Sequence, residues 1–445
     1  MSLILNDVAK FMTSKIEVSE INERNYVSTE NMLSNKGGIT IASSLPDTKS
    51  VRKYLPQDIL INNIRPYFKK IWYSDMIGGC SNDVFVIRSK ENYDSKFLYY
   101  VLSSDDFFSY VMANAKGTKM PRGDKKAIQN YEVPNFSIDE QKRISFVLSE
   151  IDKKIEVNKM INKNLEELMH VLFKKYFIDN NPFYVENDEK WNIIKLKDLI
   201  IRNRDKINDF DNWKDELLID LSNMPRFSIA ISNFDKGKKF TSNIYKLNKY
   251  DLLFGSIRPY FGKVGFSPIN GVVTGTVHSF KPIDDIYYSL VLSLISSKTF
   301  INYTVSVSKG TKMPSVKWDD FINYEFAIPD DLSKIGEYNK ILLPLIHKIE
   351  KNILEIQRLT KLRDTLLPKL MSGEIDVSKI NCDLKIIIRK IYIKSSKLFL
   401  WRYLSENKNY IKNTKSNETL LKSRTIYKIN KFLAKFNARY RYYRQ

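Results

Sequence analysis

Apolar residues recur at a seven-residue spacing along two long segments of the chain. The first segment begins after Ser137, which together with Glu140 suits a helix-capping box. Its seam positions, one of them polar, are Ile144, Leu148, Ile151, Ile155, Asn158 and Leu165. The second segment repeats the pattern at Leu342, Leu345, Ile349, Asn352, Ile356 and Leu359. A stripe this narrow is typical of a two-helix coiled coil, so we expect the two helices to pack against each other.

The simplest pairing joins the two helices of one chain, and an antiparallel pair gives a pseudo-two-fold axis. Asn158 and Asn352 occupy matching places in "IEVN" (155–158) and "IEKN" (349–352). A polar residue in such a seam usually fixes the register of the helices at some expense in stability. Contact with a partner protein is the alternative. Pro344 lies inside the second segment, where a proline either kinks a helix or marks a later start.

Shorter elements are predicted ahead of each long helix. The runs "DVFVIRS" (83–89) and "GVVTGTVHSF" (271–280) are rich in β-branched and aromatic residues and lie among Gly, Pro and Asn, as strands do. Residues 95–115 and 287–307 carry a helical pattern. Strands and helices therefore alternate within each unit, which favours an α+β fold.

Two sequence stretches occur twice. "IRPYFKK" at 64–70 returns as "IRPYFGK" at 257–263, and "KGTKMP" at 116–121 returns unchanged at 309–314. Both pairs are 193 residues apart, so the segment is duplicated with no net insertion. We predict two similar globular domains separated by two long helices packed as an antiparallel coiled coil. The expected parts are a first globular domain (1–137), a first helix (138–180), a second globular domain (181–332), a second helix (333–376) and a basic extension of uncertain order (377–445).

The first repeated stretch places a guanidinium before a proline-restricted turn. The side chains expected to project from it are Arg65, Tyr67, Lys69 and Lys70, with Arg258, Tyr260 and Lys263 in the second copy. Such a cluster can hold phosphates or hydrogen-bond a guanine edge in the major groove. A packed turn whose Arg pairs with a core carboxylate is the structural alternative.

The second repeated stretch combines Gly, Thr and Lys, which suits backbone and hydroxyl contacts to phosphate. The candidates are Lys116, Gly117, Thr118, Lys119 and Arg122, with Lys309, Gly310, Thr311 and Lys312 in the second copy. The stretch lacks the glycine spacing and the terminal Lys-Ser/Thr of a nucleotide-binding P-loop. A loop bounded by Gly and Pro that leads into a strand explains it as well.

The net charge of +21 points to a polyanionic partner, but its distribution weakens that inference. Residues 378–445 hold 18 Lys or Arg against 3 Asp or Glu, which leaves 54 basic and 48 acidic residues for the rest. The two cysteines, Cys80 and Cys382, suit a reducing cytoplasm. No apolar run is long enough to cross a membrane, so we expect a cytoplasmic protein without a membrane contact.

The order of strand, "IRPY", β-run, helix, "KGTKMP" and "VPNFSIDEQKRI" (133–144) resembles the specificity subunit of type I restriction-modification enzymes. "LLPKLMSGEIDV" (366–377) resembles the place where such subunits normally stop. The resemblance covers about residues 1–377, in both halves. The extension after it has no counterpart in the family pattern and either adds phosphate attraction or has no function.

The resemblance implies a bipartite DNA reader. Each globular domain would recognise one half of a split double-stranded DNA target, and the helices would set the spacing and dock two modification subunits. "STENMLSNKGG" (28–38) differs from "DLSNMPRFSIA" (220–230), so the target is expected to be asymmetric. The partners would supply the cofactors: S-adenosylmethionine for adenine methylation, and ATP with Mg for the restriction subunits that translocate and cleave DNA. No cofactor or metal is expected in this chain.

An enzyme and a protein-interaction scaffold are the two alternative function classes. An enzyme needs a site, and His170, His278 and His347 are scattered without a catalytic or metal-binding pattern. A coiled-coil protein-interaction scaffold without sequence-specific DNA recognition stays open. The second helix opens with "DDLSKIGEYNKI" (330–341) rather than "DEQKRI", which makes its docking surface less certain.

Overall fold

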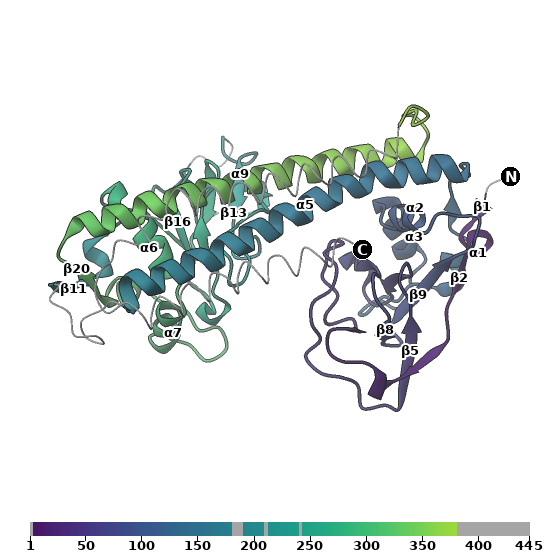
Figure 1. The fold of residues 1–445 in the computed structure, drawn as a ribbon, viewed down its shortest axis with the longest axis horizontal. Coiled ribbons are helices and arrows are strands. Elements are labelled where there is room, and N and C mark those ends of the chain that lie inside the picture. The colour runs from purple at the N-terminus through teal and green to yellow at the C-terminus, as the bar shows by residue number, and fades with distance from the viewer. Residues whose placement is uncertain (1–2, 180–189, 209–211, 240–242, 381–445) are drawn as a thin grey trace, which may run out of the picture. The chain divides into compact units, whose positions relative to one another are not determined.

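The computed structural model describes residues 3–179, 190–208, 212–239 and 243–380 of the 445-residue chain. These residues belong to one compact unit, which extends to residue 382. They form two globular domains and two long helices, α5 (Ile138–Phe173) and α9 (Leu332–Met371), which lie side by side (Figure 1). The predicted α+β class with two domains separated by helices is confirmed. Nearly all of the basic extension, from residue 381, lies outside the described residues.

The first domain contains three small sheets. They are β1 (Leu3–Ile4) with β10 (Glu132–Val133); β2 (Ala9–Phe11), β9 (Val84–Ser89), β6 (Ile59–Asn62) and β7 (Ile71–Tyr73); and β3 (Lys15–Glu17), β5 (Ser50–Tyr54), β8 (Gly78–Cys80) and β4 (Tyr26–Val27), each in spatial order. All neighbours are antiparallel except β4 and β8. Its helices are α1 (Leu5–Val8), η1 (Val18–Glu20), η2 (Pro66–Phe68), α2 (Ser95–Leu102), α3 (Asp105–Ala113) and α4 (Lys125–Gln129).

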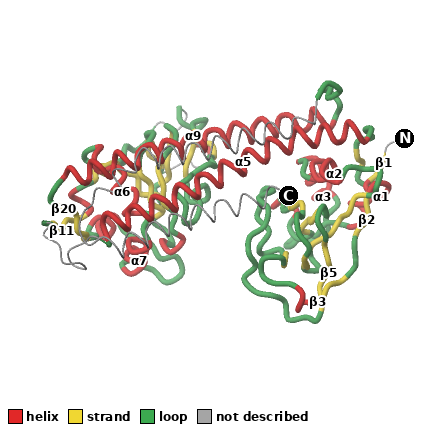
Figure 2. The backbone as a smooth tube through the Cα atoms, in the orientation of Figure 1, coloured by secondary structure: helices red, strands yellow, loops and turns green. Residues whose placement is uncertain are grey.

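The second domain repeats this topology. Its sheets are β11 (Trp191–Lys195) with β20 (Glu325–Pro329); β12 (Ile200–Arg202), β19 (Val277–Pro282), β16 (Leu252–Gly255) and β17 (Val264–Phe266); and β14 (Asp235–Lys236), β13 (Leu217–Ile219), β18 (Gly271–Thr274) and β15 (Ile244–Leu247). Its helices are η4 (Leu196–Asp198), η5 (Gly237–Lys239), η6 (Pro259–Phe261), η7 (Asp285–Tyr287), α6 (Tyr288–Ile295), α7 (Lys298–Ser306) and α8 (Trp318–Ile322). The third sheets differ at both edges. In the first domain β3 extends the sheet beside β5, whereas in the second β14 extends it on the opposite side, beside β13, the counterpart of β4. The strands of the two domains form two separate groups in Figure 2.

Three of the expected elements are divided in the structure, and one of them is 287–307, which holds α6 and α7. Residues 95–115 hold two helices, because the Ser104 side chain accepts from the Phe107 amide and starts α3. The run 271–280 holds two strands, β18 and β19, which belong to different sheets. The apolar composition of these runs did not show where one helix or strand would end and the next would begin.

Side-chain contacts show that α5 and α9 run antiparallel. Arg363 bonds to Asp152 at 2.9 Å, and the Asn352 amide donates to Asn162 at 2.7 Å. As the residue number of the bonded side chain rises along α5, the number of its partner on α9 falls, as it does in an antiparallel pair. At about 1.5 Å per residue, the 36 residues of α5 extend over about 54 Å. The helix α9 begins before Pro344 and continues through it, so the expectation of a later start is wrong.

The seam residues predicted from the heptad pattern are buried, apart from the half-buried Ile151 and Leu359. Some of them do more than join the helices. Ile144 and Leu148 belong to the core of the first domain, together with Leu367 and Leu370 from the other end of α9. The helices therefore bury a second face against the globular domains. The structure places the end of α5 at Phe173, before a π-helical turn η3 (Lys174–Ile178), while the predicted domain limits remain predictions.

Candidate nucleic-acid interface

The "IRPYF" turn has the same unusual backbone in both domains. Arg65 and Arg258 adopt left-handed conformations, with φ of 51° and 50°, immediately before the short helices η2 and η6. The turn closes on Lys69 and Gly262, again with positive φ. A left-handed residue other than glycine costs about 1–2 kcal/mol, and such strain is concentrated at functional sites. Its repetition on two Arg residues shows that the turn geometry is common to both domains.

The "KGTKMP" stretch forms a closed hairpin in both domains. Lys116 and Arg122 exchange two backbone hydrogen bonds of 2.9 Å, and Lys309 and Ser315 do the same. The hairpin requires a left-handed glycine in each copy, because Gly117 and Gly310 have φ of 89° and 106°. Four residues of each hairpin are exposed at its tip, namely Gly117, Thr118, Lys119 and Met120, and Gly310, Thr311, Lys312 and Met313.

The turn and the hairpin join into one surface. The Arg65 amide donates to the Pro121 carbonyl at 2.8 Å, and the Arg258 amide donates to the Pro314 carbonyl at 2.7 Å. Stretches that are some 50 residues apart in the sequence thus meet through an identical bond in both copies. Tyr67 and Tyr260 lie beside these bonds and keep 47% and 43% of their surface exposed. Each domain therefore presents cations and an aromatic ring together.

The two Arg side chains are not held by internal ion pairs. Within the described residues neither Arg65 nor Arg258 forms a salt bridge, and the Arg258 Nε is enclosed without a hydrogen-bond partner. The structural alternative, in which a core carboxylate binds each Arg, is therefore not observed in this part of the chain. The guanidinium groups remain available for an outside acceptor.

The Lys side chains of the turn are divided between two roles. Lys70 donates to the Thr29 carbonyl at 2.6 Å, Lys263 donates to the Leu221 carbonyl, and burial lowers the pKa of both groups. These two lysines hold the preceding loop instead of projecting as the sequence suggested. Lys69 pairs with Asp105 at 2.9 Å, and the hydrogen bond from Lys69 lowers the pKa of that carboxyl.

The hairpin cations have exposed partners. Lys116 pairs with Asp124, and Arg122 lies 3.2 Å from Asp83. Exposed ion pairs contribute at most about 1 kcal/mol, so a phosphate can replace the carboxylate at small cost. Position 315 is Ser in the second domain, and only the first hairpin therefore carries an Arg there.

The two divergent loops, residues 28–38 and 220–230, lie next to the shared turns. In the first domain, the Asn35 amide donates to the Phe68 carbonyl at 2.8 Å. In the second, the Phe227 amide donates to the Gly262 carbonyl at 3.0 Å, and the Arg226 guanidinium lies 3.8 Å from the centre of the Phe261 ring. These divergent segments therefore pack on the turn that the copies share. Divergence between the copies was the available signal for these residues.

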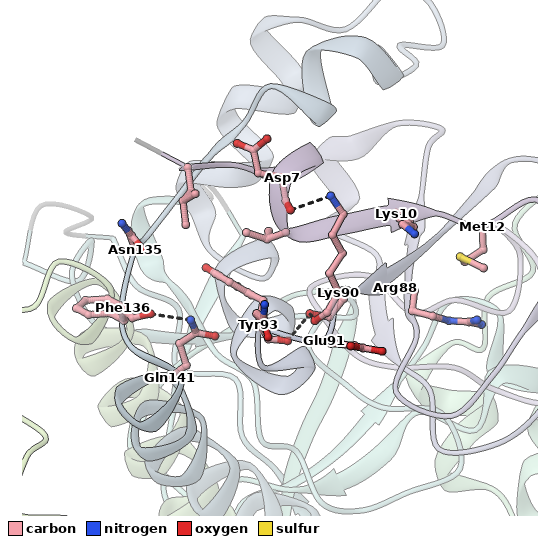
Figure 3. A pocket seen from close by; sticks show the side chains of 14 residues that line it. Asp7, Lys10, Met12, Arg88, Lys90, Glu91, Tyr93, Asn135, Phe136 and Gln141 are labelled. Atoms are coloured by element: carbon pink, nitrogen blue, oxygen red, sulfur yellow. Dashed lines mark hydrogen bonds between the residues drawn. The ribbon is translucent and has the colours of Figure 1, made fainter. Parts of the chain in front are cut away.

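A hollow lies elsewhere on the first domain. It has a volume of about 720 Å³ and lies between the β2–β9 edge and the start of α5 (Figure 3). Two of its polar side chains are already bonded: Lys90 donates to the Asn6 and Asp7 carbonyls, while Gln141 accepts from the Asp94 amide and donates to the Phe136 carbonyl. None of the predicted DNA-binding residues lines it.

The described residues also bear on two other features, a metal site and a membrane-spanning helix. There, no group of three His, Cys, Asp or Glu residues could hold a metal ion. No helix among the described residues is long and apolar enough to span a membrane.

The comparisons with known proteins agree with one another. Residues 5–167 match the family model "Type I restriction modification DNA specificity domain". The type I restriction enzyme MjaIX specificity subunit of Methanocaldococcus jannaschii is 28% identical over 320 residues, which cover 66% of this chain and 72% of that protein. The MjaVIII specificity subunit of the same organism is 24% identical over 324 residues, with 65% and 72% covered.

A solved structure shares the fold. The crystal structure of the type I restriction-modification S subunit from M. genitalium gives a TM-score of 0.53 at 16% identity and covers 83% of this chain and 96% of that one. Two globular domains on a pair of long helices, each domain with the same basic turn and hairpin, define a bipartite architecture. Residues 5–167 match a type I restriction-modification DNA specificity domain, and the chain is similar to the specificity subunits of such enzymes.

Proposed function

We propose that this chain recognises a bipartite, asymmetric sequence in double-stranded DNA, with one half-site for each globular domain. The observation that carries the proposal is the repeated bond between turn and hairpin, from Arg65 to Pro121 and from Arg258 to Pro314. It gives both domains one basic frame, and phosphate contacts from such a frame position a protein on the duplex.

Sequence discrimination would come from the loops that pack on this frame. Residues 28–38 and 220–230 differ in sequence but each bonds to its own "PYF" turn. Different side chains on a shared frame contact different base edges, since each base pair presents its own pattern in the major groove. The two half-sites should therefore have unrelated sequences.

The helices α5 and α9 would set the distance between the half-sites. Half-site centres about one helical turn apart, near 34 Å, lie on the same face of the duplex. A pair of helices of 36 and 40 residues, joined by polar and apolar contacts, suits a fixed spacing. The same helices would dock two modification subunits and, through them, restriction subunits.

The chemistry would lie in those partners. The modification subunits would bring S-adenosylmethionine and methylate adenine, while the restriction subunits would use ATP and Mg. This chain would contribute recognition and assembly but no catalytic group.

The proposal is tested by sequencing DNA methylation in a host that expresses the chain with its modification partner. A split motif with a methylated adenine in each half is expected, and exchanging residues 1–137 for those of a relative should change one half of it. A coiled-coil scaffold that does not recognise DNA would give no motif. Absence of a motif with an active partner would overturn the proposal.

A further inference from the structure

The carboxylate of Glu166 is buried between α5 and the divergent loop of the second domain. The residue is 7% exposed, lies near the C-terminal end of α5, and accepts a 2.8 Å hydrogen bond from the Ser228 hydroxyl. The backbone of Ile229 and Ala230 also bonds to it. Burying a carboxylate is expensive unless hydrogen bonds compensate. Here the compensating donors all come from the loop, so the loop conformation and the helix depend on each other.

The loop is held from three directions. Besides Glu166, α9 contributes Gln357, whose side chain donates to the Ser232 carbonyl at 3.2 Å. The "PYF" turn accepts from the Phe227 amide at its Gly262 carbonyl. Phe227 itself has a left-handed φ of 52°, is 63% exposed, and places its ring against Gly262. The anchors thus fix the backbone at the point where an exposed aromatic ring packs on the turn.

The adjacent side chain belongs to the same arrangement. The Arg226 guanidinium lies 3.8 Å from the centre of the Phe261 ring, within the repeated turn. Arg226 and Phe227 together provide a charged donor group and an exposed ring. Base recognition by an Arg fork needs a fixed direction, because its bidentate hydrogen bonds to guanine depend on geometry.

The first domain is anchored in another way. Among the described residues, the side chains of its loop bond within the domain, for example Thr29 to Asn62 at 2.7 Å and Lys36 to Asp105 at 3.0 Å. Its bonds to α5 come from outside this loop, for example from α2, where the Tyr100 hydroxyl donates to Asp152 at 2.7 Å, and from the Asp94 amide, which donates to Gln141 at 2.8 Å. Among the described residues, the divergent loop of the second domain thus bonds directly to a carboxylate of a long helix. The loop of the first domain has no such bond in this part of the chain.

We propose that Glu166 is a positioning residue for recognition of the second half-site. By fixing Ser228 and the following amides, it sets the direction in which Arg226 and Phe227 leave the loop. The spacer helix then does more than set a distance, because it also shapes one of the two recognition surfaces. This inference rests on the proposed function.

The test compares variants in the methylation experiment. Glu166→Ala should make the half of the motif recognised by the second domain degenerate, with discrimination there reduced about tenfold, as for one lost base contact. Glu166→Gln keeps an acceptor for Ser228 and should retain most of the discrimination. Glu167→Ala removes a neighbouring exposed carboxylate and should leave the motif unchanged. The half recognised by the first domain is an internal control.

A further variant covers the case in which Glu166→Ala does not fold. Ser228→Ala removes the loop hydroxyl that donates to Glu166 and should reduce sequence discrimination in the same half of the motif. An intact second half in both Ser228→Ala and Glu166→Ala would overturn this inference alone. Equal loss of both halves would also overturn it, since that result indicates general destabilisation. A wild-type chain that yields no split motif would instead refute the proposed function.

Discussion

The side-chain amide of Asn352 on α9 donates a 2.7 Å hydrogen bond to the Oδ1 of Asn162 on α5. Both residues are buried, with 0% and 3% of their surface exposed. A second bond, from Asn158 to Glu355 at 2.9 Å, lies close by with the roles of the helices exchanged. The two donors occupy matching positions in the copies, while the acceptors, Asn162 and Glu355, do not. The two bonds favour a register-fixing role for these Asn residues, because a shift of one helix would separate both pairs.

Replacing Asn352 alone should destabilise the protein. Asn352→Leu leaves the Asn162 amide group buried without its partner, which costs about 1–3 kcal/mol. Urea denaturation followed by circular dichroism would measure the change. The double variant Asn162→Leu/Asn352→Leu should recover much of the stability, since both polar groups are then removed. A single variant as stable as the wild type would contradict a structural role for the pair.

Removing either turn guanidinium should weaken DNA binding and leave the fold intact. Arg65→Ala and Arg258→Ala each delete a side chain that has no ion pair among the described residues. We expect an affinity loss of about tenfold each and a salt slope reduced by about one. Titration of a duplex carrying the target at several salt concentrations measures both. Lys153→Ala, which removes an exposed cation of α5 paired with Glu150, is the matched control. Unchanged DNA affinity in both Arg variants would show that Arg65 and Arg258 have only a structural role in the turn.

Charged residues placed between α5 and α9 should prevent assembly with the modification subunit, and this effect should not depend on the DNA sequence. Ile155 is 4% exposed in the seam and Ile151 is half-buried beside it. Ile151→Asp/Ile155→Asp buries carboxylates without partners, so we expect a loss of stability of at least several kcal/mol. Thermal unfolding and size-exclusion chromatography with the modification subunit would detect it. Lys159→Asp, on the exposed face of α5, should have little effect.

The second domain should lose stability below neutral pH through His278. This side chain is 7% exposed, and its Nε2 lies 3.1 Å from the Val316 carbonyl. Burial lowers the pKa of His278 to about 4, and the nearby Arg202 and Arg204 act in the same direction. The unfolded chain, with a pKa near 6.5, then binds the proton more readily than the folded one. The contribution is therefore complete above pH 6.5 and declines as the pH falls toward 4.

Melting temperatures at pH 7.5 and pH 5 test this expectation. The wild type should lose more on acidification than His278→Gln, which cannot be protonated in this range. The difference is the relevant quantity, because other groups titrate equally in both proteins. Equal losses would show that His278 does not carry the effect.

The sequence predicted the parts of the fold that depend on local or repeated patterns. The constant offset between the copies gave two domains, and the heptad spacing that includes Ile155 and Ile349 gave the helix pair. Contacts between distant segments could not be predicted in this way. The bond from Arg65 to Pro121 depends on how the strands are arranged between them. Lys70 and Lys263 were expected at the surface because composition does not show which cations bond to backbone carbonyls.

Glu166 shows why the candidate site could be predicted only in part. In the sequence it is one of many acidic residues on a helix, and its heptad position gives no sign of the loop from residue 228 that covers it. The pairing of helix and loop appears only when the second domain has folded against α5. The repeated motifs, in contrast, were visible because each occurs twice.

The core of the first domain includes Leu367, Leu370 and Val377, which come from the far end of the described chain. A ribosome therefore releases the N-terminal domain long before it has made the residues that complete its interior. Until then the nascent domain exposes apolar surface, and it depends on the last helix to arrive and cover it. We expect chains truncated before residue 360 to need chaperones or to aggregate, so that only a fully synthesised subunit enters an assembly.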